Sequence, residues 1–184
     1  MASTATEPMT AEELALLPED GWRYELVRGK LRRKSPSSFR PSNVAARTLA
    51  RIVAFADEQS LGEVTGDDGG HLVEPAPDTV RAPDAAFVRA ERLPTREEQE
   101  QFAPIVPDLA VDVMSPSHRP RGVEEKVAQY LAAGVPLVWV FHSRQQTATV
   151  HRTGRSPRVL GLGETLDGEE ILLGFRLPLA DVFR

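Results

Sequence analysis

The sequence predicts a mixed α/β fold in which helices pack on a central mixed sheet. Helical and strand-like segments follow each other in the order helix, strands, helix, strands, buried strand, helix, strands. The segment DLAVDVM is an almost continuous apolar run, which is typical of a strand buried on both faces. Hydrophobic residues make up 41% of the 184 residues, as is ordinary for a packed globule. This order of elements favours one sheet with helices packed against it.

The N-terminal residues predict a tail followed by a short helix. Residues 1–9 show no pattern of a folded element and are expected to form a flexible tail. Thr10 and Glu13 have the spacing of a capping box, and Pro18 ends the helix that they begin. Because no repeat or linker interrupts the remainder, residues 10–184 are expected to form a single domain.

A hairpin and a long helix are predicted next. The runs WRYELV and KLRRKS alternate between apolar and polar residues and are separated by Arg28 and Gly29, as in a β-hairpin. The segment SPSSFRPS is rich in turn-forming residues and predicts a loop. From Asn43 to Gln59, apolar residues recur at helical spacing and predict an amphipathic helix.

The rest of the chain alternates strands with two further helices. Strand-like stretches occur at residues 63–65, 71–74 and 84–89, and TREEQEQF predicts a short acidic helix. After the buried strand DLAVDVM, a helix is expected over residues 122–133, where Gly134 stops it. The runs LVWVFH and TATVHR then predict a strand pair, followed by shorter strands up to the C-terminus.

The composition excludes several classes of protein. The chain has no cysteine, which rules out disulfide scaffolds, cysteine-ligated zinc and thiol catalysis. No apolar run approaches the roughly 20 residues that cross a bilayer, and MASTATEPMT lacks the regions of a signal peptide. We therefore expect a cytoplasmic protein with no membrane partner.

The charge is distributed unevenly along the chain. The net charge of −5 argues against a polyanionic partner, yet nine of the 22 basic residues and a single acid lie from Gly21 to Arg51. That segment carries +8, which leaves −13 for the remainder. Local fields decide where a polyanion docks. Two interpretations stay open: a nucleic-acid interface, or a solvated hairpin and helix with many arginines.

Three carboxylates stand where a sheet favours apolar residues. Asp112 lies mid-strand between two valines. Asp84 begins the run DAAFV, and Glu25 lies inside WRYELV. Burying an ionised carboxylate costs on the order of several kcal/mol unless a cation or hydrogen-bond donors compensate it. The three would either converge on a divalent metal, which prefers hard oxygen ligands, or serve singly as a capped turn, a buried ion pair or a strand-edge acid.

A lysine on the second long helix has two possible orientations. At 100° per residue, Lys126 lies at the edge of the apolar stripe of this helix, next to Tyr130. From there its side chain either reaches over the sheet towards Asp112 or extends to water along Tyr130. Spacing alone favours the second orientation.

Five segments carry a resemblance to a known family. They are RYELVRGKL, VRAPDAAFV, PDLAVDVMSPS, EEKVAQYLAAGVPLVWV and GFRLPLADVF, and they occur in the order that the family shows. Through them the chain resembles the Uma-two family of endonucleases, a bacterial group within the PD-(D/E)XK restriction-endonuclease-like superfamily. The resemblance runs from about Met9 to Phe183 and implies the restriction-endonuclease-like fold.

The resemblance also implies roles for particular residues. Asp84 would be the main metal-bridging carboxylate, and Asp112 would stand in place of the usual glutamate as the second acid. The backbone carbonyl of Val113 would complete the site for Mg²⁺ or Mn²⁺. Glu25 would assist metal or water binding. Lys126 would be the superfamily's catalytic lysine, relocated from the strand to the following helix.

A Mg²⁺-dependent endonuclease acting on DNA is the function that this resemblance implies. A homodimer is expected with it, because cutting both strands of a duplex needs two sites. The phosphate backbone would be held by the basic residues Arg28, Lys30, Arg32, Arg33, Lys34, Arg47 and Arg51.

Several positions depart from the family pattern. Ser42 or Asn43 stands where a histidine usually opens the long helix, and His118 and His142 stand where aspartates are common. These departures and the shorter acid at Asp112 leave a second interpretation open. In it, the chain is a nucleic-acid-binding or interaction module that keeps the fold without turnover.

Overall fold

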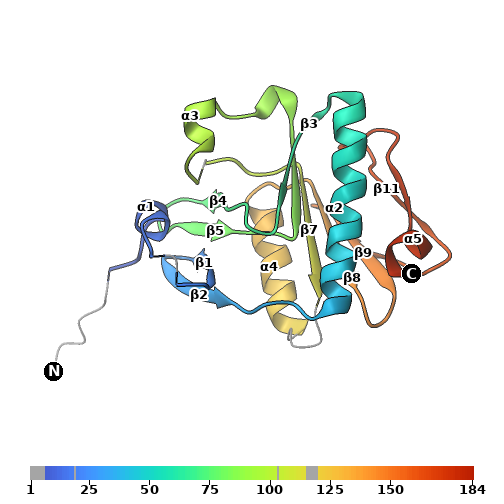
Figure 1. The fold of residues 1–184 in the computed structure, drawn as a ribbon, viewed down its shortest axis with the longest axis horizontal. Helices are drawn as coiled ribbons and strands as arrows, with labels where there is room; N and C mark the ends of the chain where they lie inside the picture. Colours follow the sequence, from blue (N-terminus) through green and yellow to red (C-terminus); the bar gives the residue numbers. More distant parts are fainter. Residues whose placement is uncertain (1–6, 19, 103, 115–119) are drawn as a thin grey trace. The chain divides into compact units, whose positions relative to one another are not determined.

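The computed structural model describes residues 7–18, 20–102, 104–114 and 120–184, and Figure 1 shows its elements. The chain forms two compact units that interleave along the sequence. Unit 1 comprises Met1–Pro36, Gly70–Ala82 and Pro94–Ile105, and unit 2 comprises Ser37–Gly69, Pro83–Leu93 and Val106–Arg184. The single domain over residues 10–184 stays a prediction. Most of the predicted tail, residues 1–6, lies outside the described residues.

Unit 1 is a small antiparallel sheet with two short helices. Its strand order is β2-β1-β5-β4. The predicted hairpin is confirmed: β1 and β2 pair along their length, and Arg28 and Gly29 between them both have positive φ, as a tight hairpin turn requires. Thr10 and Glu13 form the predicted capping box. The elements of this unit are α1 (Ala11–Ala15), β1 (Arg23–Val27), β2 (Lys30–Lys34), β4 (His71–Glu74), β5 (Thr79–Arg81) and α3 (Arg96–Gln99).

Unit 2 is built on a six-stranded mixed sheet with the order β10-β9-β8-β7-β6-β3. Its pairings are antiparallel except that between β7 and β8, which α4 connects as a crossover helix. A two-stranded sheet of β11 and β12 and the short helix α5 follow. The elements are α2 (Phe39–Gln59), β3 (Gly62–Gly66), β6 (Ala85–Arg89), η1 (Ala90–Arg92), β7 (Leu109–Met114), α4 (Pro120–Ala132), β8 (Leu137–His142), β9 (Thr147–His151), β10 (Arg158–Leu160), β11 (Thr165–Asp167), β12 (Arg176–Pro178) and α5 (Leu179–Phe183).

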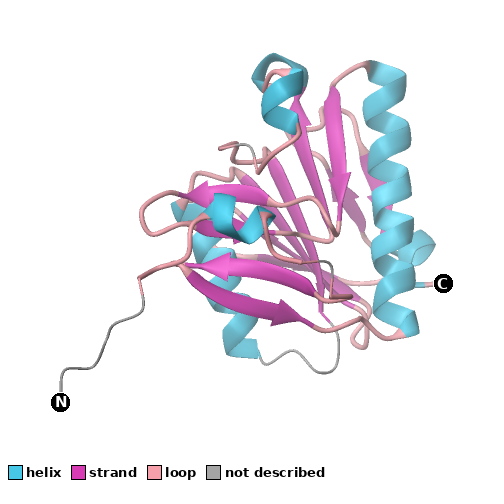
Figure 2. Cartoon of the chain, turned by 60° about the vertical axis from the view of Figure 1, so that its left-hand side comes forward, coloured by secondary structure: helices cyan, strands magenta, loops and turns pink. Residues whose placement is uncertain are grey.

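The two faces of the six-stranded sheet carry different partners. Successive side chains of a strand point to opposite faces. Val111 and Val113 of β7 join the main hydrophobic core with Ile52 of α2, and Figure 2 shows α2 running along this sheet. Asp112 therefore points to the other face, where Lys126 of α4 contacts it. The apolar run of β7 is buried on both faces, as predicted, with Asp112 as its polar interruption.

The structure confirms the mixed α/β fold class and differs from the expected elements in three respects. The strands of the described residues form three sheets instead of one. The hairpin pairs with β5 in the sheet of unit 1, and β11 pairs with β12 in a separate two-stranded sheet. Helix α2 begins at Phe39, within the expected loop, since Pro41 lies in its first turn, where a missing N–H costs nothing. The sequence analysis missed β5 and α5, which are only three and five residues long. In the described part of the chain, no helix combines the length and the apolar character that a membrane span requires.

Candidate active site on the second unit

The pairing of β6 with β7 sets two carboxylates side by side. The antiparallel register places Ala85 opposite Val111. Asp84 directly precedes β6, and Asp112 directly follows Val111, so the two acids lie next to this last printed pair. Asp84 is also attached to β7, because its Oδ2 accepts a hydrogen bond of 2.6 Å from the backbone N–H of Val113. The chain thus brings the two predicted metal ligands together.

Helix α4 adds a cation to this pair of acids. The Lys126 Nζ lies 2.6 Å from Asp112 Oδ1, and the two side chains are 15% and 14% exposed. Of the two orientations left open by the helical spacing, the reach over the sheet is observed, and the one favoured by spacing alone is wrong. The ammonium also lies 5.7 Å from the centre of the Tyr130 ring. Asp84, Asp112 and Lys126 are called the acid–lysine cluster below.

The cluster stabilises a charge that the sheet would otherwise exclude. Removing a carboxylate from water is costly, and a nearby ammonium with good geometry offsets much of that cost. The pair thereby compensates the carboxylate of Asp112 on a strand whose other side chains are mostly buried. In the folded chain, negative charge and hard oxygen atoms are concentrated at the end of β7.

The same face of the sheet carries further polar groups that sequence reasoning did not assign to the site. Because β8 runs parallel to β7, Met114 pairs with His142 and Asp112 with Val140, which in turn pairs with Thr149 of β9. The His142 Nε2 and the Thr149 Oγ1 lie 3.1 Å apart, and burial lowers the pKa of His142. The alternation of LVWVFH, combined with the parallel register, is the signal that would have placed His142 here.

Glu25 belongs to unit 1, where it forms a buried ion pair. Arg81 Nη1 donates a hydrogen bond of 2.7 Å to its Oε2, and the backbone N–H of Ala82 donates one of 3.2 Å to Oε1. The two side chains of the pair are about one-tenth exposed. Of the alternatives for this acid, the structure therefore shows the ion pair. The assistance that Glu25 would give to a metal stays a prediction.

The basic residues of the hairpin divide between its two faces. Lys30, Arg32 and Lys34 pair with Val27, Glu25 and Arg23, so the three share the face of Glu25. Arg33 points to the opposite face, where its guanidinium lies 3.6 Å from the centre of the Trp22 ring. Arg28 occupies the turn. The hairpin is thus not uniformly charged: Lys30, Arg32 and Lys34 lie on one face, and the other face carries the cation–π contact of Arg33 with Trp22.

Arg47 and Arg51 lie on α2, in unit 2. Arg47 Nε donates a hydrogen bond of 2.8 Å to Asn43 Oδ1, and Arg51 forms a 3.5 Å ion pair with Asp181. Since α2 packs against the face of the sheet opposite to Asp112, the structure does not join these arginines to the acid–lysine cluster. His118 lies outside the described residues.

The donor set of the acid–lysine cluster fits a small divalent cation. The carboxylates of Asp112 on β7 and of Asp84 just before β6 provide hard oxygen atoms, and Mg²⁺ often binds one or two carboxylates and keeps several waters. Over the described residues, no group of three or more histidine, cysteine or acidic side chains is arranged to hold a metal ion. A site here would therefore depend on Asp84 and Asp112, with water and substrate supplying the other ligands.

The mixed α/β fold of the chain is shared with a protein of known structure. The structure is similar to the crystal structure of a putative nuclease of DUF820 from Anabaena variabilis, with a TM-score of 0.81 and 20% sequence identity. The similarity covers 96% of this chain and 98% of the other.

Residues 11–180 match the model of the Uma2 family, which is described as a putative restriction endonuclease. The chain belongs to this family, and its membership supports a nuclease function in general. No curated protein is significantly similar to the chain.

Proposed function

We propose that the chain is a metal-dependent endonuclease that hydrolyses phosphodiester bonds of DNA. The observation that carries this proposal is the acid–lysine cluster, in which the register of β6 with β7 and the 2.6 Å ion pair gather Asp84, Asp112 and Lys126. Two oxygen ligands for a metal ion, with a lysine beside them, suit metal-assisted phosphoryl transfer. Membership of the Uma2 family supports the same reaction class.

In the proposed site, Asp84 and Asp112 with the carbonyl of Val113 would hold Mg²⁺ or Mn²⁺. The bound ion would polarise the phosphate and lower the pKa of a water ligand. Lys126 positions Asp112 through its ion pair and offsets negative charge that develops on the phosphate. The hydrogen bond from Val113 fixes the carboxylate of Asp84, so the geometry exists before substrate arrives. Glu25 remains part of the proposal as an assisting acid.

For binding the nucleic acid, the best candidates are the basic residues on the Glu25 face of the hairpin. Lys30 and Arg32 are exposed, and each lies on a strand that holds it at a fixed spacing. Phosphate contacts of this kind position a nucleic acid without reading its sequence. A homodimer and a cytoplasmic location complete the proposal as expectations.

A second candidate function, a binding module without turnover, has its own support in the structure. The ion pair with Lys126 already compensates the charge of Asp112, so these two residues have a structural role even if no metal binds. Calorimetric titration with Mg²⁺ or Mn²⁺ separates the two functions. A nuclease takes up the ion through Asp84, whereas a binding module shows no heat that depends on Asp84.

Cleavage of supercoiled plasmid with Mg²⁺ or Mn²⁺ tests the proposed activity. We expect the Asp84→Asn and Lys126→Met variants to lose at least about 100-fold in cleavage rate, since each removes a group that acts on the transition state. Asp57→Asn is a matched control, because Asp57 is an exposed aspartate of α2. No metal-dependent cleavage by the parent chain, or cleavage by Asp84→Asn at the parent rate, contradicts the proposal.

A further inference from the structure

A small pocket lies between α2 and the C-terminal segment of unit 2. Its volume is about 120 Å³, well below the roughly 300–1,000 Å³ of sites that enclose a whole small molecule. It therefore fits one compact group of a ligand. The lining residues are Arg47, Ala50, Arg51, Leu177, Asp181, Val182 and Arg184.

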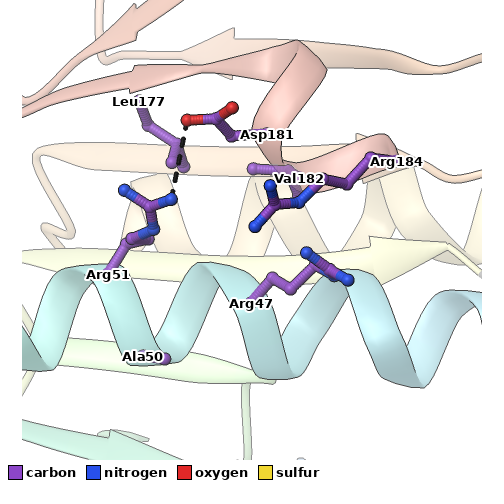
Figure 3. Close-up of a pocket in the computed structure, with 7 residues that line it drawn as sticks. All are labelled: Arg47, Ala50, Arg51, Leu177, Asp181, Val182 and Arg184. Atoms are coloured by element: carbon purple, nitrogen blue, oxygen red, sulfur yellow. Dashed lines mark ion pairs between the residues drawn. The ribbon is translucent and has the colours of Figure 1, made fainter.

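Three arginines line this pocket. Figure 3 shows Arg47 and Arg51 rising from α2 towards the segment that carries Asp181 and Arg184. The hydrogen bond from Arg47 Nε to Asn43 uses one edge of that guanidinium and fixes its orientation. With one aspartate among three arginines, the side chains of the lining carry a formal charge of +2. This excess of positive charge favours the approach of an anion.

Asp181 supplies only weak compensation. It lies 3.5 Å from Arg51, and the two side chains are 40% and 52% exposed. Ion pairs between exposed side chains contribute little, because water screens the attraction. An anion with more charge and more acceptor oxygens than one carboxylate would displace Asp181 from Arg51.

The pocket and the acid–lysine cluster use different faces of the same sheet. Helix α2 packs on the core face with Val111 and Val113, whereas Asp112 and Lys126 meet on the other face. A group bound between Arg47 and Arg51 is therefore not the phosphate that the cluster would cleave.

We propose that Arg47, Arg51 and Arg184 form a phosphate-binding site, with Asp181 as the internal competitor of the ligand. The planar guanidinium matches phosphate oxygens through paired hydrogen bonds, which favours phosphate over a monovalent anion. The phosphate group belongs either to the backbone of a nucleic acid or to a free phosphate. The first source rests on the proposed nuclease function, and the second is independent of it.

Binding measurements in EDTA, where metal-dependent cleavage cannot occur, test this site. Inorganic phosphate is titrated by calorimetry, and an oligonucleotide without terminal phosphates is titrated by fluorescence anisotropy. We expect Arg47→Ala and Arg184→Ala to weaken binding about tenfold each, because each removes a charged hydrogen-bond donor. Asp181→Asn is expected to strengthen binding about threefold, since it removes the competing carboxylate. Arg144→Ala is the control, because Arg144 is an exposed arginine of unit 2 outside the pocket.

The two titrations also identify the source of the phosphate. If the pocket variants change the affinity for the oligonucleotide alone, the site binds the backbone of a nucleic acid. If they change the affinity for inorganic phosphate alone, it binds a free phosphate group. If the pocket variants match Arg144→Ala in both titrations, or if Asp181→Asn does not strengthen either, the site is refuted. Because cleavage is not measured, absence of nuclease activity leaves this result unaffected.

Discussion

His71 illustrates how burial controls the charge of a single residue in this protein. It lies on β4, is 3% exposed and pairs with Arg81 of β5. The guanidinium of Arg81 forms an ion pair with Glu25. Burial lowers the pKa of His71, while a hydrogen bond to the backbone of Ile105 acts in the opposite direction. The folded state therefore favours the neutral imidazole. A lone histidine without a sequence motif is in this case a buried structural residue.

The depressed pKa of His71 predicts a loss of stability in acid. A histidine in the unfolded chain has a pKa of about 6.5. Below that pH the unfolded state therefore binds a proton at His71, whereas the folded state leaves His71 neutral until the pH is lower. As the pH is lowered from there, the free energy of unfolding decreases by at most about 1.4 kcal/mol per pH unit, until the pH is below the pKa of His71 in the folded state. Urea denaturation between pH 7.5 and 5 measures this slope.

The variant His71→Gln is expected to reduce that slope without abolishing it. Burial also lowers the pKa values of His142 and His151, so these residues add to the acid loss with the same sign. Parallel stability profiles for the variant and the parent chain would show that His71 does not titrate with folding.

At the scale of elements, the junction between α2 and β3 depends on close backbone approach. Ser60 ends α2 in a left-handed conformation, and Gly62 follows with a φ of 151°. A Cβ on Gly62 would lie 2.0 Å from the carbonyl oxygen of Val88 on β6. No side chain fits there, because that oxygen belongs to the paired neighbouring strand. Glycine at this position allows β3 to pair with β6 as the edge strand of the sheet.

Gly62→Ala is therefore expected to lower the free energy of unfolding by about 2 kcal/mol or more. Gly122→Ala provides the contrast, because Gly122 lies in α4 with open space around the position of its Cβ. That substitution is expected to stabilise the chain by about 0.5–1 kcal/mol, since alanine loses less entropy in a helix. Chemical denaturation of the two variants measures both effects, and equal changes of the same sign would contradict the argument.

How much the sequence predicts also differs between elements. Capping residues gave a correct prediction of α1, alternating runs around a turn that of the hairpin, and apolar spacing with a stop signal that of most of α4. The start of α2 was wrong because Pro41 was interpreted as a loop residue, although the first helical turn accepts proline. The three-residue β5 offers too few positions for an alternating pattern to stand out.

On the scale of the whole molecule, the net charge says little about binding. The protein carries −5, yet Lys30, Arg32 and Lys34 lie on one face of the hairpin. Because exposed charges are screened within about 8–10 Å at physiological salt, a nucleic acid responds to the nearest charges and not to the total. Binding through this face is expected to be weak and to decrease steeply as salt increases.

The salt dependence of oligonucleotide binding tests which face of the hairpin is used. The double substitution Lys30→Ala and Arg32→Ala is expected to reduce the slope of log K against log salt by about two, because two phosphate contacts are lost. Arg33→Ala is the matched control, since Arg33 points to the other face and covers Trp22. An equal reduction by Arg33→Ala would mean that the hairpin does not bind through the Glu25 face.

The sequence by itself determined the fold class and the family, and it singled out Asp84 and Asp112 as candidate ligands, because periodicity, capping and motifs are local properties of the chain. The tertiary structure decided which of these residues meet. Asp84 reaches the backbone of β7 beside Asp112 only through the pairing of β6 with β7, and Lys126 reaches Asp112 only because of how α4 lies on the sheet. Arg184 joins Arg47 only through the packing of α5 near α2. Such contacts join positions far apart in the chain, and no local pattern specifies the strand register or helix rotation that forms them.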